Sequence, residues 1–466
     1  MKKTSVGFVI LIFVLSFLWC SFQCQCAGAD MKFPAPPGML PLPKKDMRTG
    51  GQIQVGPGSE LAVPPSFAGK YKAAVESARK TISSLPGGNG KVKIQAVAGS
   101  QSAAAEGLPE KPGGYLIEIG GKGITVTGRD DQGILNGLTT LEVLLINEKG
   151  RLRMGKVLDW PDLTTRAVHI MQKDIAPETV EQLITAARYG HFNLLLLSLA
   201  DGVRIPSMER MLGKRPWTKE ELLKVANYAN ENGMTVVPEL RLLTHQEKFL
   251  KQGHPQLMFN HSTYNPDNPE TYKVVFKIMD DIIDILKPKA MHIGHDEIAG
   301  YKDDAKSLPM RLLKDEKMLP PELFFKDVEI LHNHLKERGV ETWMWGDMLI
   351  SPDEFPQMQG RQLHGHRGYS AIRSRISKDI VICDWHFGDK QKDFPSASAF
   401  ANQGNRVLGA TFINPETTRN FSRYVAGMPR GGEGMIVALW GMVRRDKTEV
   451  VHDMLKVAAN SFWNAK

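Results

Sequence analysis

The feature that most constrains the fold is a repeated alternation of strand and helix patterns, which begins after Asp159 and continues to the end of the chain. Several of the apolar runs have no polar alternation, as in 194–197, which is typical of strands that are covered on both faces. We predict eight strands, at 163–171, 192–199, 235–240, 290–294, 342–349, 379–387, 407–414 and 434–442. Segments with helical spacing separate them, at 177–189, 219–232, 270–286, 321–338, 394–403 and 415–425, and a last one follows at 449–462.

Eight strand–helix units in roughly 300 residues predict an α/β fold, namely a (β/α)8 TIM barrel. We assign this barrel to residues 156–466. An open doubly wound sheet is the alternative from the pattern alone. No glycine-rich phosphate turn follows the first predicted strand, which disfavours a nucleotide site, and we expect no cofactor.

Residues 1–29 have the pattern of a secretory signal peptide. Lys2 and Lys3 precede an apolar run over 6–19 that is too short to span a bilayer comfortably, and Ala27-Gly28-Ala29 provides a small-residue cleavage site. We predict cleavage after Ala29 and export to the periplasm or medium of a bacterium, with no membrane association afterwards. An uncleaved N-terminal anchor is the alternative.

Removal of this segment changes the cysteine inventory. Three of the four cysteines lie within it, and Cys383 alone remains. One cysteine cannot form an internal disulfide, so we expect packing alone to hold the exported protein. The formal net charge of +8 comes from dispersed residues without a basic stripe, and we therefore expect no nucleic-acid partner.

The region 30–155 reads as a small N-terminal α/β domain. Its first part, 30–66, is rich in Pro and Gly and predicts an extended lead-in along the surface. Beyond it we predict a helix over 71–85, a strand over 91–97, a hairpin of 115–119 with 123–127, and a helix over 132–146.

Polar and aromatic residues gather at the predicted strand ends, where the chemistry of such a barrel is placed. Tryptophan faces stack on sugars, while carboxylates hold hydroxyls and move protons, so the set predicts a carbohydrate site. Its members are Arg166 in strand one, Asp201 after strand two, Glu239 and His245 at strand three, His292, His295, Asp296 and Glu297 at strand four, Trp343, Trp345 and Asp347 at strand five, Asp384, Trp385 and His386 at strand six, and Trp440 at strand eight.

The adjacent acids Asp296 and Glu297 are the sharpest signal. Neighbouring carboxylates cannot easily be the opposed acid and nucleophile of an ordinary retaining glycosidase, which face each other about 5 Å apart. Side by side, each raises the cost of ionising the other, so one can stay protonated. This suits one general acid and one carboxylate that orients a nucleophile belonging to the substrate. A solvated acidic loop is the alternative.

These residues resemble the pattern of glycoside hydrolase family 20, the β-N-acetylhexosaminidases. The run His292-Ile-Gly-His-Asp-Glu297 is similar to that family's His-x-Gly-x-Asp-Glu motif. Pro238-Glu239 with His245 resembles its third strand, and Asp159-x-Pro161 followed by Arg166 resembles the entry to its first strand. The segment 115–145 resembles the small domain that precedes its barrel.

The resemblance implies specific roles. Glu297 would be the general acid, and Asp296 would hold the acetamido group whose carbonyl oxygen attacks the anomeric carbon. An Asp201–His245–Glu297 relay would tune the acid, and Arg166 would grip ring hydroxyls. The remaining assigned residues would bind the sugar: Trp345, Trp385 and Trp440 as pocket walls, with Asp347 beside them. We expect no metal.

Several positions depart from the family pattern. The strand-two histidines are Leu196 and Ser198, a tyrosine expected after Trp385 corresponds to Phe387, and the last strand's glutamate is Met442. The catalytic residues therefore match better than those for sugar recognition. Removal of terminal GlcNAc or GalNAc is the first functional prediction. A glycan-binding protein on a decayed hydrolase barrel and hydrolysis of another 2-substituted glycoside are the alternatives.

Overall fold

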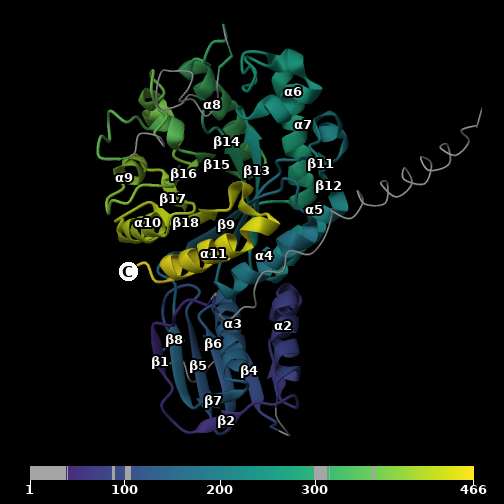
Figure 1. The fold of residues 1–466 in the computed structure, drawn as a ribbon, viewed down its shortest axis with the longest axis vertical. Helices are drawn as coiled ribbons and strands as arrows, with labels where there is room; N and C mark the ends of the chain where they lie inside the picture. Colours follow the sequence, from purple (N-terminus) through teal and green to yellow (C-terminus); the bar gives the residue numbers. More distant parts are fainter. Residues whose placement is uncertain are drawn as a thin grey trace, which may run out of the picture.

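The computed structural model describes residues 38, 40–86, 90–99, 107–298, 312–313, 315–358 and 363–466. The predicted signal peptide, residues 1–29, lies outside these described residues. Figure 1 shows two stacked parts, a small sheet with helices on one face and, above it, a larger ring of strands and helices. None of the helices within the described part of the chain is both long and apolar enough to cross a membrane.

The larger part is a closed barrel of eight parallel strands. Each strand pairs with its neighbours in chain order, and the last strand, β18, pairs with the first, β9. This confirms the predicted (β/α)8 barrel and excludes the open sheet. The strands are β9 (Thr165–Met171), β10 (Leu194–Ser198), β13 (Thr235–Leu242), β14 (Ala290–Gly294), β15 (Glu341–Trp345), β16 (Val381–Trp385), β17 (Arg406–Thr411) and β18 (Gly432–Ala438).

Helices cover the outside of the barrel at the predicted places. They start at well-formed N-termini: Thr218 and Glu221 form a reciprocal capping box, and Asn268 and Asn414 cap their helices through side-chain oxygens. Proline occupies the first turn of five of them, where its missing N–H costs nothing. The helices are α4 (Pro177–Tyr189), α5 (Lys219–Glu231), α6 (Leu250–Gly253), α7 (Pro269–Leu286), α8 (Pro321–Glu337), α9 (Pro395–Asn402), α10 (Pro415–Gly427) and α11 (Thr448–Trp463).

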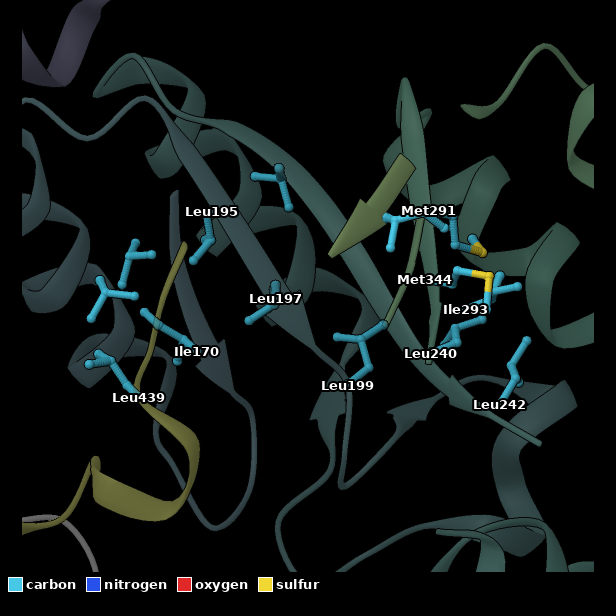
Figure 2. Close-up of a cluster of buried hydrophobic side chains, with 14 of the residues drawn as sticks. Ile170, Leu195, Leu197, Leu199, Leu240, Leu242, Met291, Ile293, Met344 and Leu439 are labelled. Carbon is cyan, nitrogen blue, oxygen red and sulfur yellow. The ribbon is translucent and has the colours of Figure 1, made fainter. Parts of the chain in front are cut away.

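Successive residues of each strand face two different environments, because side chains alternate across a strand. Leu195 and Leu197 of β10 lie in the apolar layer between strands and helices, as Figure 2 shows together with side chains from the neighbouring strands. Leu194 and Leu196 lie inside the barrel with Trp343 and other inward residues. The continuous apolar run of β10 is thus explained by burial on both faces.

The small part contains a six-stranded sheet in the order β1-β8-β5-β6-β4-β3. Its predicted hairpin and two helices are confirmed, but two expectations change. The lead-in contributes three short strands, and β8 extends the sheet to Asp159, beyond the expected boundary at 155. The elements are β1 (Lys45–Met47), β3 (Glu60–Ala62), α1 (Pro65–Lys70), α2 (Lys72–Ser83), β4 (Lys93–Ala98), β5 (Tyr115–Gly120), β6 (Gly123–Gly128), α3 (Asp131–Asn147) and β8 (Gly155–Asp159), with β2 (Gln52–Gln54) paired to β7 (Arg151–Arg153).

Buried polar contacts join the two parts. Arg188 of α4 donates to Glu142 of α3 at 3.0 Å, and both side chains are buried. Trp463 at the end of α11 is part of the small domain's apolar core, and its carbonyl accepts from Lys44 Nζ at 3.0 Å. Figure 1 shows α11 lying across the junction. The small domain therefore supports the end of the barrel opposite the strand C-termini.

Candidate active site

The turn after β14 places two acids side by side. Gly294, His295 and Glu297 have φ values of 79°, 71° and 55°, in the left-handed region. A side chain at Gly294 would be strained, because φ is left-handed there and a Cβ would stand 3.1 Å from the Cα of Arg241. Non-glycine residues adopt this region at an energetic cost, and such strain concentrates at functional sites. Here the strained backbone brings adjacent carboxylates to one partner.

That partner is His245, which follows β13 and is itself left-handed, with φ of 59°. Its Nε2 lies 3.2 Å from Asp296 Oδ2 and 3.7 Å from Glu297 Oε2. The side chains of Asp296 and Glu297 are 10% and 26% exposed. The structure thus brings together three of the four predicted catalytic residues and leaves the tip of Glu297 within reach of a ligand.

The two acids are pushed toward opposite protonation states. Burial raises the pKa of Glu297 above its usual range, and the neighbouring charge of Asp296 raises it further. Burial alone would also raise the pKa of Asp296, but the charge and hydrogen bond of His245 and the charge of Arg241 bring it below the usual range. Two carboxyl groups whose pKa values are driven apart can serve as acid and base at one site.

Asp347 organises the side of Glu297 away from His245. It begins the short helical turn η6 (Asp347–Leu349), which follows β15, and it is 1% exposed. Its Oδ2 accepts from the backbone N–H of Glu297 at 2.9 Å and lies 2.7 Å from His364 Nδ1. Its Oδ1 accepts from Trp385 Nε1 at 3.1 Å. Asp347 is therefore a positioning residue that joins the acid to an aromatic wall.

The predicted tryptophans form that wall together with a phenylalanine. Trp385 stacks on Phe387 with ring centroids 4.6 Å apart, and Phe387 lies edge-on to Trp440 at 6.5 Å. Trp440, in η9 (Trp440–Met442), lies 5.6 Å from Trp345. Trp345 is 1% exposed and forms the floor, whereas Trp440 is only partly buried. Phe387 occupies this wall without the hydroxyl that the family pattern predicts there.

Beneath the floor lies a buried acid that fixes it. Glu239 Oε1 accepts from Trp345 Nε1 at 2.9 Å, and Oε2 lies 3.0 Å from His169 Nε2. Burial alone would raise the pKa of Glu239, but the charge and hydrogen bond of His169 lower it to about 2. The ring of His169 also contacts Trp440 at 4.4 Å. Glu239 and His169 thus orient the tryptophans rather than act on a ligand.

Asp201 lies near His245 but is bonded elsewhere. Its Oδ2 accepts from the backbone N–H of Asp174 at 2.7 Å and of Arg215 at 3.4 Å. Among the described contacts there is none between Asp201 and His245, so the predicted Asp201–His245–Glu297 relay is not formed. Asp201 and His245 instead line one cavity of about 920 Å³ at the ends of β9, β10 and β13.

Arg166 is not part of the mouth, and its predicted role in gripping sugar hydroxyls is wrong. It is the second residue of β9, at the N-terminal end of the barrel, and is 2% exposed. Its guanidinium donates to the carbonyls of His191 at 2.7 Å and Leu163 at 2.8 Å, and lies over the ring of Trp463. Burial lowers its pKa to about 9. Arg166 therefore closes the junction with the small domain.

Among the residues that the structure describes, His245, Asp296 and Glu297 are the group that could hold a cation. One ligand atom from each lies within 4.8 Å of the others. The raised pKa of Glu297 means that a proton competes with any cation for that carboxylate. His295, by contrast, is committed to Asp327 at 2.9 Å. The donor set fits proton transfer better than metal binding.

Two functional residues were missed from the sequence. His169 lies two positions after Ala167 in β9, so both side chains face the barrel interior. This alternation could have identified His169 from the sequence. His364 belongs to a loop without regular structure, and the run His364-Gly-His366 is the only signal in the sequence that could have identified it. Its contact with Asp347 is set by tertiary structure.

Comparison with known proteins agrees with this architecture. Glycosyl hydrolase family 20, catalytic domain, matches residues 178–413, and domain 2 of the same family matches residues 36–160. A solved β-N-acetylhexosaminidase of this family from Streptomyces coelicolor aligns with a TM-score of 0.69 at 17% identity, covering 93% of this chain and 92% of that one. A β-N-acetylhexosaminidase from Bacteroides fragilis aligns with a TM-score of 0.67 at 17% identity, covering 91% of this chain and 90% of that one.

The chain matches its curated relatives over only part of their length. The chain is 22% identical over 287 residues to a lacto-N-biosidase of Bifidobacterium bifidum, covering 59% of this chain and 24% of the relative. It is 22% identical over 313 residues to β-hexosaminidase 1 of Coccidioides posadasii, covering 59% of this chain and 49% of the relative. The matched region thus spans less than half of either relative. With both the barrel and the preceding domain matched in order, the chain belongs to glycosyl hydrolase family 20, a family of glycosidases.

Proposed function

We propose that this protein is an exported glycosidase that removes terminal β-linked N-acetylhexosamine with substrate assistance and net retention. The observation that carries the proposal is the Asp296–Glu297 pair, whose pKa values move in opposite directions at an aromatic-walled mouth. A family of hexosaminidases supplies the substrate class. The order of steps follows from which of the two acids keeps its proton.

In the first step, the protonated Glu297 donates its proton to the glycosidic oxygen while that oxygen leaves the anomeric carbon. The carbonyl oxygen of the substrate's own 2-acetamido group attacks the same carbon and forms an oxazolinium ring. Asp296 stays ionised, accepts the amide N–H and stabilises the positive charge. Its Oδ1 is buried and has no hydrogen-bond partner among the described residues, so it is available for that N–H.

In the second step, the Glu297 carboxylate takes a proton from water, and the water oxygen attacks the anomeric carbon. The acetamido carbonyl departs, and Glu297, which now holds the proton from water, is ready for the next cycle. Two inversions at one carbon give net retention. His245, 3.2 Å from Asp296, keeps that carboxylate charged and oriented through the cycle.

The decisive experiment replaces the acid. Glu297→Gln should lower kcat on an aryl β-N-acetylglucosaminide by about 10²–10⁴-fold, because a general acid contributes that much. Glu337→Gln, at a side chain that is 77% exposed, is the matched control and should match the wild type. Turnover by Glu297→Gln equal to that of the control contradicts the proposal.

A panel of aryl glycosides separates the alternatives. Substrate assistance predicts turnover of 2-acetamido glycosides and little of 2-hydroxy glycosides. The second candidate, a glycan-binding protein, is favoured by Phe387, which lacks the hydroxyl of the family pattern, and by Met442, which stands where that pattern has a carboxylate. Sugar binding by calorimetry with no turnover of any glycoside would support this second candidate. Preferred turnover of another 2-substituted glycoside would instead support the third candidate, a hydrolase of that glycoside.

Export is proposed from residues 1–29 alone. The measurement is N-terminal sequencing of the protein recovered from separate cell fractions. A mature N-terminus at Asp30 in the exported fraction is the expected result. Retention of Met1 in a membrane fraction would instead identify an anchor.

A further inference from the structure

The cavity beside the acid pair carries an unusual charge distribution. Its walls come from the ends of β9, β10 and β13 and from the loop that precedes β12 (Trp217–Thr218). His245 lines this cavity and also contacts Asp296 of the acid pair, so the cavity lies next to the proposed reaction centre. Four cationic side chains line it: Lys173, Lys214, Arg241 and Lys248.

Within the described residues, these cations have no counter-ion at ion-pair distance. None of the four forms an ion pair within 4.0 Å there, whereas some exposed lysines elsewhere do, as Lys224 does with Glu181 at 3.0 Å and Lys336 with Asp379 at 2.7 Å. Like charges around one cavity repel each other, and the field they create attracts an anion.

Three acids, Asp174, Asp201 and Glu247, line the same cavity, so the four cations outnumber the acids by one. Asp201 is buried, and its carboxylate accepts hydrogen bonds from two backbone N–H groups of the protein. Asp174 and Glu247 are exposed, as are the three lysines. The positive charge also reaches the reaction centre, because Arg241 contributes to the low pKa of Asp296.

The backbone holds these walls in place. A Cβ at Gly213 would stand 2.2 Å from Asp201 Oδ1, so the loop carrying Lys214 lies directly against the end of β10. The backbone of Arg241, at the end of β13, packs against Gly294 of the strained turn. At about 920 Å³ the cavity has the size of a typical small-molecule site, roughly 300–1,000 Å³, and can take a substituted sugar.

We propose that this cavity binds an anionic group of the glycan, so that the physiological substrate is an acidic N-acetylhexosamine-containing glycan. Sulfate esters, phosphate esters and carboxylates share the required chemistry. Lysines bind such groups as point charges, while arginine adds a two-pronged hydrogen-bond donor. The inference rests on the proposed function for the reaction, but the charge selectivity can be measured separately.

The test compares three aryl N-acetylglucosaminides: a neutral one, one with a sulfate on the sugar, and one with a sulfate on the aryl group. The cavity predicts that kcat/KM for one of the sulfated substrates exceeds that for the neutral one by about 10-fold in dilute buffer, and that salt reduces this ratio as charges are screened. The two sulfated substrates show whether the anion belongs to the terminal sugar or to its neighbour.

Variants link the preference to the cavity. The double variant Lys214→Glu/Lys248→Glu should lower the sulfated-to-neutral ratio by about 10-fold, because two attractive charges become repulsive. Lys277→Glu, on an exposed position of α7 outside the cavity, is the matched control and should leave the ratio unchanged. If circular dichroism shows that the double variant does not fold, Lys248→Gln replaces it. We expect Lys248→Gln to lower the sulfated-to-neutral ratio by about 3-fold.

A binding measurement distinguishes an error in this inference from an error in the proposed reaction. Calorimetry on Glu297→Gln with the sulfated and neutral 2-acetamido sugars needs no turnover. Tighter binding of the sulfated sugar, weakened by the double variant, supports the cavity even if no glycoside is hydrolysed. Equal binding and equal kcat/KM for sulfated and neutral compounds overturn the inference, even if neutral substrates are hydrolysed well.

Discussion

The two halves of the barrel mouth are built differently. On the β14–β16 side, Asp347 is bonded to Glu297, Trp385 and His364, and every distance is 3.1 Å or less. On the other side, a cationic cavity lies at the ends of β9, β10 and β13, and the family's polar residues correspond to Leu196 and Ser198 of β10 and to Met442 after β18. The difference indicates that the catalytic half is pre-organised, while the recognition half has diverged. Function and specificity can therefore be tested independently.

The largest effect should come from the catalytic half. Asp296→Asn keeps the shape of the side chain but removes the charge that stabilises the oxazolinium in the proposed mechanism. We expect kcat on an aryl N-acetylglucosaminide to fall by about 10²–10³-fold, comparable with loss of one preorganised electrostatic contact. Asp453→Asn, at a side chain that is 80% exposed, serves as control. A loss below 10-fold would mean that the acetamido group is not held by Asp296.

The next effect tests whether Asp347 positions the acid. Asp347→Asn loses a charge between Glu297, Trp385 and His364, and we expect kcat to fall by about 10–100-fold with little change in KM. The charge of Asp347 also helps to raise the pKa of Glu297. Since Glu297 acts when protonated, the alkaline limb of the kcat/KM profile should move to lower pH.

A purely structural role for Asp347 would give a different result. Thermal unfolding measured beside the kinetics reports stability. A lowered Tm with no movement of the alkaline limb of the kcat/KM profile would show that Asp347 contributes only to packing.

A smaller effect should appear in the recognition half. Met442 follows Trp440 and Gly441 in η9, and a thioether cannot accept sugar hydroxyls as a carboxylate does. Met442→Glu should lower KM for the neutral aryl substrate by about 3–10-fold, the net contribution of one ordinary hydrogen bond. Met442→Gln tests whether the charge matters. An unchanged or higher KM in Met442→Glu would show that this half binds sugars by another geometry.

The smallest effect connects the halves. Arg241 helps to lower the pKa of Asp296, so Arg241→Gln should raise that pKa. Asp296 acts when ionised, and activity on a neutral substrate is lost as pH falls through its pKa. The acidic limb of kcat/KM should therefore move to higher pH, with a change of about 2-fold or less at the optimum. Lys277→Gln should leave the limb in place. Movement to lower pH would contradict the electrostatic link.

The sequence predicted the architecture well, because burial on both faces and helical spacing are local signals. The run 194–197 identified β10, and helix α4 was predicted with the same bounds that the structure gives. The three short strands of the lead-in were missed. They pair with segments far along the chain, as Lys45 does with Leu158, and three-residue strands have no periodicity of their own.

The site was predicted in part. Asp296, Glu297, His245, Asp347 and the three tryptophans lie at one mouth, as their positions at strand ends indicated. The role predicted for Arg166 was wrong because it rested on motif similarity, whereas the alternation of side chains along β9 points the other way. Ala167 and His169 face the interior, so Arg166 faces outward, and it lies at the wrong end of its strand. The contacts of Asp201 and His364 depend on loop conformations that the sequence pattern does not encode.

The contact between Trp463 and the small domain has a consequence for how the chain acquires its structure during synthesis. Lys44 and Trp463 are 419 positions apart, yet the indole completes the core around Tyr115 and Val157. The ribosome therefore presents the small domain with its hydrophobic surface incompletely covered until almost the whole barrel has been translated. Domains that emerge first usually fold first. Here the core of the first domain is completed by a side chain of the last helix, so the small domain and the barrel reach their final packing together.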